Sequence, residues 1–145
     1  MGNSAGLRYL LDTNILSALI RQPQGLVAST LARRGYATVC TSIVVAAELR
    51  FGALKLGSRT LTARLDDLLA SLPILALEAG ADRIYAEVRL RLEQAGTPIG
   101  PNDLLIAAHA LESGLTLVTD NSDEFGRVAG LQVENWLEGP TSEPA

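Results

Sequence analysis

The 145-residue chain has very few of the residue types on which several classes of site depend: one cysteine, one histidine, one lysine, and only 4% aromatic residues. A single cysteine excludes an internal disulfide and a cysteine-based zinc site. Cys40 lies among β-branched residues, so we expect a small buried hydrophobe and not a reactive thiol. His109 has no fitting serine nucleophile, so we expect it to be packed or hydrogen-bonded inside the fold and not to act in a serine–histidine–aspartate triad.

Long hydrophobic runs are also missing. No apolar stretch approaches the roughly 20 residues that a membrane span needs, and residues 1–8 lack the apolar segment of a signal peptide. Hydrophobic residues nevertheless make up 48% of the chain, enough for a sizeable core. We therefore expect one cytoplasmic domain over residues 1–138, without membrane contact, followed by a flexible C-terminal tail over residues 139–145.

The charge balance is mildly acidic, with 16 acidic and 12 basic residues and a net charge of −4. Proteins that hold nucleic acids through their phosphates are usually basic. Bound divalent cations would reverse the local sign of an acidic cluster, and all but one of the basic residues are arginines, which suit phosphate recognition. The net charge therefore neither supports nor excludes a nucleic-acid substrate.

Hydrophobic periodicity and glycine, proline and capping signals divide the chain into alternating strands and helices. We expect strands at 8–12, 37–41, 73–77, 115–119 and 131–135, and helices at 15–21, 26–34, 43–56, 58–71, 81–95 and 103–113. Strands separated by helices predict an α/β fold, with a mostly parallel sheet of four or five strands covered by helices on both faces.

Four acidic residues differ in context from the others. Asp12 and Asp120 each follow a predicted strand, and Asp103 opens a helix after a loop rich in glycine and proline. Glu48 is a lone charge in an apolar helix, which is costly unless it has a partner. Because the ligand crevice of an open α/β sheet lies at the carboxyl ends of its strands, we expect these acids to converge there. Crowded carboxylates repel one another, and Mg²⁺ or Mn²⁺ would relieve that repulsion.

Each acid also has an ordinary structural explanation. Asp12 or Asn14 can cap a helix, and an acid in a first helical turn, such as Asp103, is favourable to the helix dipole. Asp120 and Asp123 can be turn residues, and Glu48 can pair with Arg50 or Arg8. These explanations account for each residue singly, but they account poorly for the joint placement of all four.

Four segments carry these acids: LLDTNIL (10–16), SIVVAAELRFG (42–52), NDLLIAAHA (102–110) and LVTDNSDEF (117–125). Together and in this order they resemble the signature blocks of PIN-domain ribonucleases, most closely those of the VapC toxins of bacterial toxin–antitoxin pairs. The resemblance spans residues 8–136. Any one block is weak evidence, whereas the ordered set is specific.

The resemblance implies a PIN-like three-layer sandwich and a metal-dependent endoribonuclease holding one or two Mg²⁺ or Mn²⁺ ions. It also implies an RNA substrate, a cognate antitoxin partner and a homodimer. The implied catalytic and metal-binding acids are Asp12, Glu48, Asp103 and Asp120, with Asp123 as an alternative or additional metal ligand. Groups implied to orient these ligands are Thr13, Asn14, Ser42, Thr119 and Asn121.

Substrate contacts and rival functions are less defined. Candidate RNA-binding residues are Arg50, Lys55, Arg59 and Arg64, although ordinary solvated charges explain them equally well. The leucine-rich segment 61–72 offers a candidate dimer surface. A non-catalytic PIN-like binding module stays open as an alternative. An aspartyl-phosphate phosphotransfer enzyme using Asp12 is disfavoured, because the second aspartate of Asp-x-Asp is Asn14 and the sole lysine lies in an early helix.

Overall fold

The computed structural model describes residues 6–138, so the predicted tail lies outside the described residues. The five strands are β1 (Tyr9–Leu11), β2 (Val39–Ser42), β3 (Ile74–Leu75), β4 (Thr116–Val118) and β5 (Val133–Glu134). The helices are α1 (Thr13–Arg21), α2 (Leu26–Arg34), the 3₁₀ turn η1 (Tyr36–Thr38), α3 (Ile43–Leu56), α4 (Arg59–Ala70), α5 (Ala81–Gln94), α6 (Pro101–Ser113) and α7 (Ser122–Phe125). The predicted α/β alternation is confirmed.

The strands form one sheet in the order β3-β2-β1-β4-β5, and every neighbouring pair is parallel. Leu11 of β1 is in register with Val118 of β4. From β1 the chain builds outward to β2 and β3 on one side, and β4 and β5 are added on the other. The crevice of such a sheet opens where this order reverses, so the carboxyl ends of β1 and β4 flank the expected ligand site.

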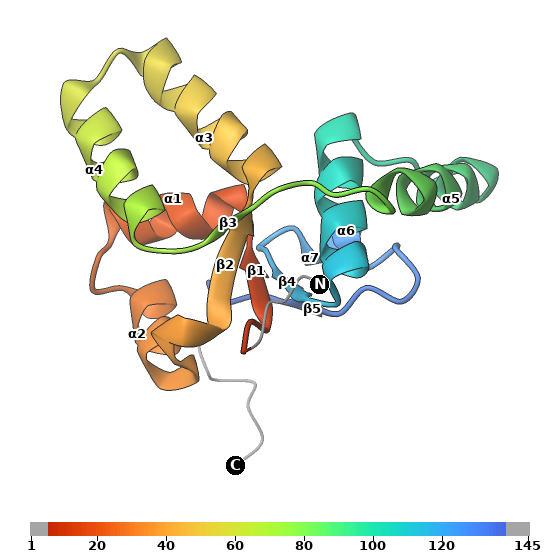
Figure 1. The fold of residues 1–145 in the computed structure, drawn as a ribbon, viewed down its shortest axis with the longest axis horizontal. Coiled ribbons are helices and arrows are strands. Elements are labelled where there is room, and N and C mark those ends of the chain that lie inside the picture. Colours follow the sequence, from red (N-terminus) through yellow and green to blue (C-terminus); the bar gives the residue numbers. More distant parts are fainter. Residues whose placement is uncertain (1–5, 139–145) are drawn as a thin grey trace.

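Helices cover the strands on two sides, which gives the three layers of the sandwich. Figure 1 shows α1, α2 and α4 on one side of the strands and α5 and α6 on the other. The central strand β1 is wholly buried, with Leu10 and Leu11 both at 0% exposure. A strand buried on both faces reads as a continuous apolar run, as Tyr9–Leu11 does.

Two of the helix ends that glycines predict depend on a left-handed backbone. Gly57 after α3 and Gly114 after α6 have φ of 67° and 69°, and their N–H groups donate to carbonyls of the last helical turn. A residue with a Cβ is strained in this conformation. At the other ends, Ser42 and Ser58 cap α3 and α4 through their side-chain oxygens.

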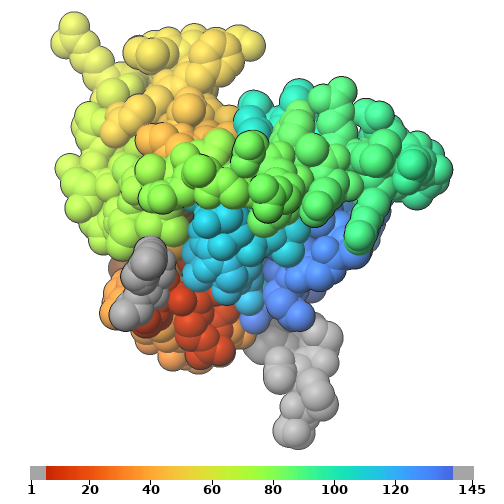
Figure 2. Space-filling model, turned by 45° about the vertical axis from the view of Figure 1, so that its right-hand side comes forward, coloured from red at the N-terminus to blue at the C-terminus, as the bar shows by residue number. Residues whose placement is uncertain are grey.

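The helices α3 and α4 form a hairpin that stands out from the body of the molecule, as Figures 1 and 2 show. The leucine face of α4 does not form the exposed surface that we predicted for a dimer. Leu65 and Leu69 are buried, and Leu61, Leu68 and Leu72 pack against the core. The reason is that α4 turns this face back onto α1 and α3, as an amphipathic helix on a sheet sandwich must.

Two further boundaries differ from expectation. Helix α6 begins at Pro101, so Asp103 lies in its first turn and not at its start, in keeping with the preference of proline for the first helical position. The segment after β4, expected as a turn, contains the short helix α7, because Phe125 is completely buried and anchors it.

No helix in the described part of the chain is long and apolar enough to cross a membrane.

Candidate active site

Asp12 lies at the carboxyl end of β1, where it also caps α1. Its Oδ1 accepts a hydrogen bond of 2.7 Å from the Thr13 backbone N–H, and its Oδ2 accepts one of 2.8 Å from Thr119 Oγ1. The parallel register of β1 and β4 brings Asp12 and Thr119 side by side. The residue is only 5% exposed, and its two carboxylate oxygens are held in one orientation by the first residue of α1 and by the residue that follows β4.

Glu48 is held from α1 and from α6. Thr13 Oγ1 donates to its Oε1 at 2.8 Å, and Asn102 Nδ2 donates to its Oε2 at 2.9 Å. The ion pairs considered as alternatives are not formed: Arg50 instead bonds Asp66 at 2.8 Å. Glu48 is therefore a carboxylate with neutral donors on both oxygens, aimed at the crevice beside Asp12.

Asp103 and Glu124 meet across the site from α6 and α7. Burial raises the pKa of Asp103, and the hydrogen bond and charge of Glu124 raise it further, as do the charges of Asp12 and Glu48. Together these effects bring the pKa of Asp103 to about 7. The surroundings of this carboxyl group therefore favour its neutral form when no cation is bound.

The pKa of Asp12 is also raised by burial and by neighbouring negative charges. Its pKa is raised mainly by burial, and also by the charges of Glu48 and Asp120. The hydrogen bonds from Thr13 and Thr119 lower it and offset part of that rise. Acids from four separate segments of the chain thus lie close enough for their charges to act on Asp12 and Asp103, as their sequence context led us to expect.

The hydrogen bonds made by the side chains of residues 120–124, in the segment after β4, go either to α1 or to groups of the segment itself. Asp120 Oδ1 accepts from Asn14 Nδ2 at 2.7 Å, which ties the segment to α1. Asn121 donates through its side chain to Glu124 and through its backbone to Thr119 Oγ1. Asp123 is exposed on α7 and takes part in none of the interactions found for Asp12 and Asp103.

Glu124 is the site residue that sequence reasoning missed. A signal was present, because Asn121 and Glu124 have the spacing of a helix cap and the third residue of the following helix. We had expected residues 119–125 to form a turn and not a helix. The helix α7 turns Glu124 toward Asp103 and leaves its neighbour Asp123 in solvent.

The donor set suits a hard divalent cation. Within residues 6–138 no group of three or more histidine, cysteine or acidic side chains is arranged so that it could hold a metal ion. Mg²⁺ does not need such a group, since it keeps several waters and is held by one or two carboxylates. The raised pKa of Asp103 reflects a repulsion between carboxylates that a bound cation would relieve. Oxygen donors and mutual repulsion together fit Mg²⁺ or Mn²⁺.

The rare side chains are both buried away from this chemistry. His109 is completely buried, and its Nδ1 lies 2.8 Å from Ser42 Oγ, so its prediction as a packed and hydrogen-bonded residue is confirmed. Cys40 is completely buried, and burial raises the pKa of its thiol to about 12, which confirms a hydrophobic role.

The predicted basic rim lies on the projecting hairpin. Arg50 is engaged by Asp66, and Lys55 Nζ lies 5.9 Å from the centre of the Phe51 ring. Arg59 and Arg64 are exposed on α4. The structure thus leaves these last two as the more accessible cations of the four.

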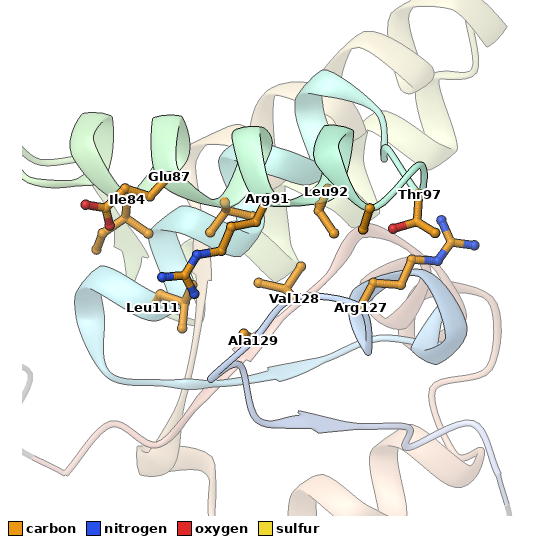
Figure 3. A pocket seen from close by; sticks show the side chains of 11 residues that line it. Ile84, Glu87, Arg91, Leu92, Thr97, Leu111, Arg127, Val128 and Ala129 are labelled. Atoms are coloured by element: carbon orange, nitrogen blue, oxygen red, sulfur yellow. The ribbon is translucent and has the colours of Figure 1, made fainter.

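A second basic surface was not predicted. A pocket of about 330 Å³ lies between α5, α6 and the turn at 127–129, and Arg91 and Arg127 line it over an apolar floor that includes Leu92 and Val128 (Figure 3). Neither arginine forms an ion pair within the described residues. Thr97 of the loop that leads to Asp103 borders the pocket, and Arg127 lies one turn beyond Glu124. None of the site acids lines the pocket itself.

Comparison with known proteins agrees with this geometry. The chain is 39% identical over 130 residues to ribonuclease VapC2 of Rickettsia felis, covering 88% of this chain and 97% of that protein. It is 35% identical over 132 residues to the tRNA(fMet)-specific endonuclease VapC of Shigella flexneri, covering 90% and 98%.

Solved structures show the same likeness. VapBC2 from Rickettsia felis, bound to a DNA fragment from their promoter, superposes with a TM-score of 0.82 at 37% identity, covering 90% of this chain and 99% of that one. VapBC-5 of Mycobacterium tuberculosis, a member of the VapBC family of toxin–antitoxin systems, gives 0.66 at 26% identity, covering 90% and 98%. The family profile described as PIN domain matches residues 9–131, and the chain belongs to the PIN-domain family.

Proposed function

We propose that the protein is a divalent-metal-dependent endoribonuclease. The observation that carries the proposal is the convergence of Asp12, Glu48, Asp103 and Glu124, beside Asp120, where the strand order reverses between β1 and β4. Relatives over nearly the whole chain are named ribonuclease and endonuclease VapC, which supports the same activity.

The residues divide the chemistry between them. Asp12 and Asp103 are the proposed principal ligands of Mg²⁺ or Mn²⁺, because they are the two acids whose pKa is raised by crowding and burial. Glu48, oriented by Thr13 and Asn102, is placed to orient an attacking water or accept its proton. Glu124 is the third proposed ligand. Asp120 lies at the edge of the site, where we propose that a second ion binds.

A bound divalent ion supplies the positive charge that stabilises a phosphodiester under attack and makes the attacking water more acidic. PIN-domain nucleases generally depend on such an ion. In this chain the protein's share is to hold the carboxylates rigid: Thr119 and the Thr13 N–H fix Asp12, so it cannot turn away from the crevice.

The phosphotransfer alternative loses further support. Lys55 is exposed near the end of α3 and contacts Phe51, so no lysine lies beside Asp12 to assist phosphoryl transfer. A non-catalytic binding module would have no use for a set of crowded carboxylates around the buried Asp12, since such groups cost stability when no metal is bound. A nuclease function explains why the protein tolerates this loss of stability.

As the toxin of a pair, the protein would work in the cytoplasm and be held inactive by a cognate antitoxin. The VapBC complexes to which it is similar support this proposal. A homodimer is also proposed, and the exposed apolar side chains Phe51 and Leu54 of α3 are its better candidate surface now that the leucines of α4 pack inward.

The test is RNA cleavage by the purified full-length protein with Mg²⁺ or Mn²⁺, on an mRNA fragment, total tRNA and tRNA(fMet). We expect cleavage that EDTA stops and that Asp12→Asn abolishes, while the matched surface variant Asp67→Asn cleaves as the wild type does. Intact RNAs under all metal conditions, or equal cleavage by Asp12→Asn, would refute a nuclease function.

A further inference from the structure

We propose that His109, the only histidine of the chain, is a positioning residue that locks α6 against the start of α3 and so aligns the acids carried by these two helices. The inference rests on the proposed nuclease function for its effect on activity. The link itself can be measured without any activity. Nothing in the reaction described above uses this imidazole.

The first observation is the bond between two completely buried groups. His109 Nδ1 lies 2.8 Å from Ser42 Oγ, and both residues are at 0% exposure. Ser42 is also the N-cap of α3, where its Oγ accepts from the Val44 N–H at 3.0 Å. One hydroxyl therefore joins the first turn of α3 to the middle of α6.

The second observation is a matching contact farther along the same two helices. Asn102 Nδ2 of α6 donates to Glu48 Oε2 of α3 at 2.9 Å. Glu48 follows Ser42 by six residues, and Asn102 precedes His109 by seven, so each helix advances about two turns between the contacts. The helices thus run antiparallel. Two contacts join them: the buried one between His109 and Ser42, and the one between Asn102 and Glu48 at the site.

The carbonyl near the imidazole ring favours the tautomer that carries its proton on Nε2. Since Ser42 Oγ accepts from the Val44 N–H, its own hydroxyl hydrogen is free to be donated to Nδ1. The second lone pair of Ser42 Oγ can instead accept from an Nδ1–H, so this contact forms with either neutral tautomer of the ring. The nearby Ala76 carbonyl, at the end of β3, suits an N–H donor, although Nε2 has no partner within hydrogen-bonding distance among the described residues.

The consequence concerns the outer contact. Asn102 and Asp103 lie in the first turn of α6, which has no side-chain cap of its own. Without the inner link, α6 can shift or rotate on α3, and Asn102 then loses Glu48 while Asp103 moves relative to Asp12. Loss of an outer partner of this kind usually costs about 10- to 100-fold in activity.

The activity test uses three replacements of similar size. His109→Asn keeps an acceptor near the Nδ1 position, His109→Gln keeps a polar group near the Nε2 position, and His109→Leu keeps neither. We expect kcat to fall about 10- to 100-fold for Leu and Gln, with KM for RNA little changed, and to be largely restored in Asn. Ile106→Val is the matched control for a packing defect in α6, and should change Tm but not kcat. Equal kcat for Asn, Gln and Leu would overturn the positioning role.

The structural test is ¹⁵N NMR of the imidazole in tag-free protein, where a single histidine gives an unambiguous signal. We expect a neutral ring with Nδ1 as the unprotonated, hydrogen-bonded nitrogen near neutral pH, and a shift of the Nδ1 resonance in Ser42→Ala. The same spectrum in wild type and Ser42→Ala would overturn the link. If the wild type cleaves no RNA, the proposed function fails, and this spectrum still decides whether the link exists.

Discussion

Glu124 of α7 faces Asp103 of α6 across the site and is, after burial, the main cause of the raised pKa of Asp103. Burial and neighbouring negative charge favour the neutral form of the Asp103 carboxyl group, whereas a bound cation would favour its ionised form. The pair thus couples metal binding, pH and stability in one contact.

The first prediction concerns stability and pH. The pKa of Asp103 is raised to about 7 in the fold from 3.8, so its favourable contribution is complete at low pH and is lost as pH rises through 7. The side chain of Asn does not ionise, so Asp103→Asn lacks this loss. In EDTA, the free energy of unfolding of Asp103→Asn minus that of the wild type should therefore increase by about 2 kcal/mol between pH 4 and pH 8. Thermal and urea unfolding at both pH values measure this. Saturating Mg²⁺ should shrink the gain, and a pH-independent difference would contradict the assignment.

The second prediction distinguishes neighbouring acids. Glu124→Gln should lower cleavage about 10- to 100-fold, because Glu124 lies against Asp103. Asp123→Asn, one residue away and exposed, should retain activity within about twofold. Initial rates at saturating Mn²⁺ compare them, with Asp120→Asn as the third member of the series. A larger loss in Asp123→Asn than in Glu124→Gln would reverse our choice.

The third prediction tests the orientation of Glu48. Thr13→Val removes the hydroxyl that donates to Oε1 at 2.8 Å while keeping the shape of the side chain. We expect kcat to fall about 10-fold with little change in KM, since Glu48 then keeps only its bond from Asn102. Thr62→Val, which removes a hydroxyl bonded within α4, is the control and should leave kcat unchanged.

The fourth prediction concerns substrate contact. If Arg91 and Arg127 bind phosphates of RNA that leaves the cleavage site, each alanine substitution should raise Kd and reduce the dependence of log Kd on log salt by about 0.7, the value for one contact to a single strand. Arg83→Ala, exposed on α5 outside the pocket, controls for net charge. The pair Arg59→Ala and Arg64→Ala tests the rim on the hairpin by the same measurement. An unchanged salt slope in Arg91→Ala and Arg127→Ala would assign RNA binding elsewhere.

The fifth prediction concerns Cys40. Its thiol is completely buried, donates to the Tyr9 carbonyl at 3.5 Å, and has a pKa raised to about 12 by burial. It should not react with a thiol reagent such as Ellman's at pH 8 in the native protein, and should react fully in urea. Rapid reaction in the native state would show that β2 opens readily to solvent.

Local patterns were enough to predict the order of strands and helices, the parallel α/β class and the special context of Asp12, Glu48 and Asp103. The reason is that capping residues, glycine stops and apolar periodicity act over a few neighbours, and a strand end followed by an acid is visible without knowing the fold. A lone glutamate in an apolar helix is equally visible, because burying a charge demands a partner wherever that partner lies.

Other features were decided by the tertiary structure alone. Whether Glu124 or Asp123 faces the site depends on how Phe125 anchors α7, and the partners of Glu48 depend on the crossing of α1, α3 and α6. The leucines of α4 face inward because the hairpin folds back on α1, and His109 meets Ser42 because the two helices pack antiparallel. Side chains one residue apart on a helix point about 100° apart, so the packing of whole elements, which no local pattern encodes, selects the residue that reaches the site.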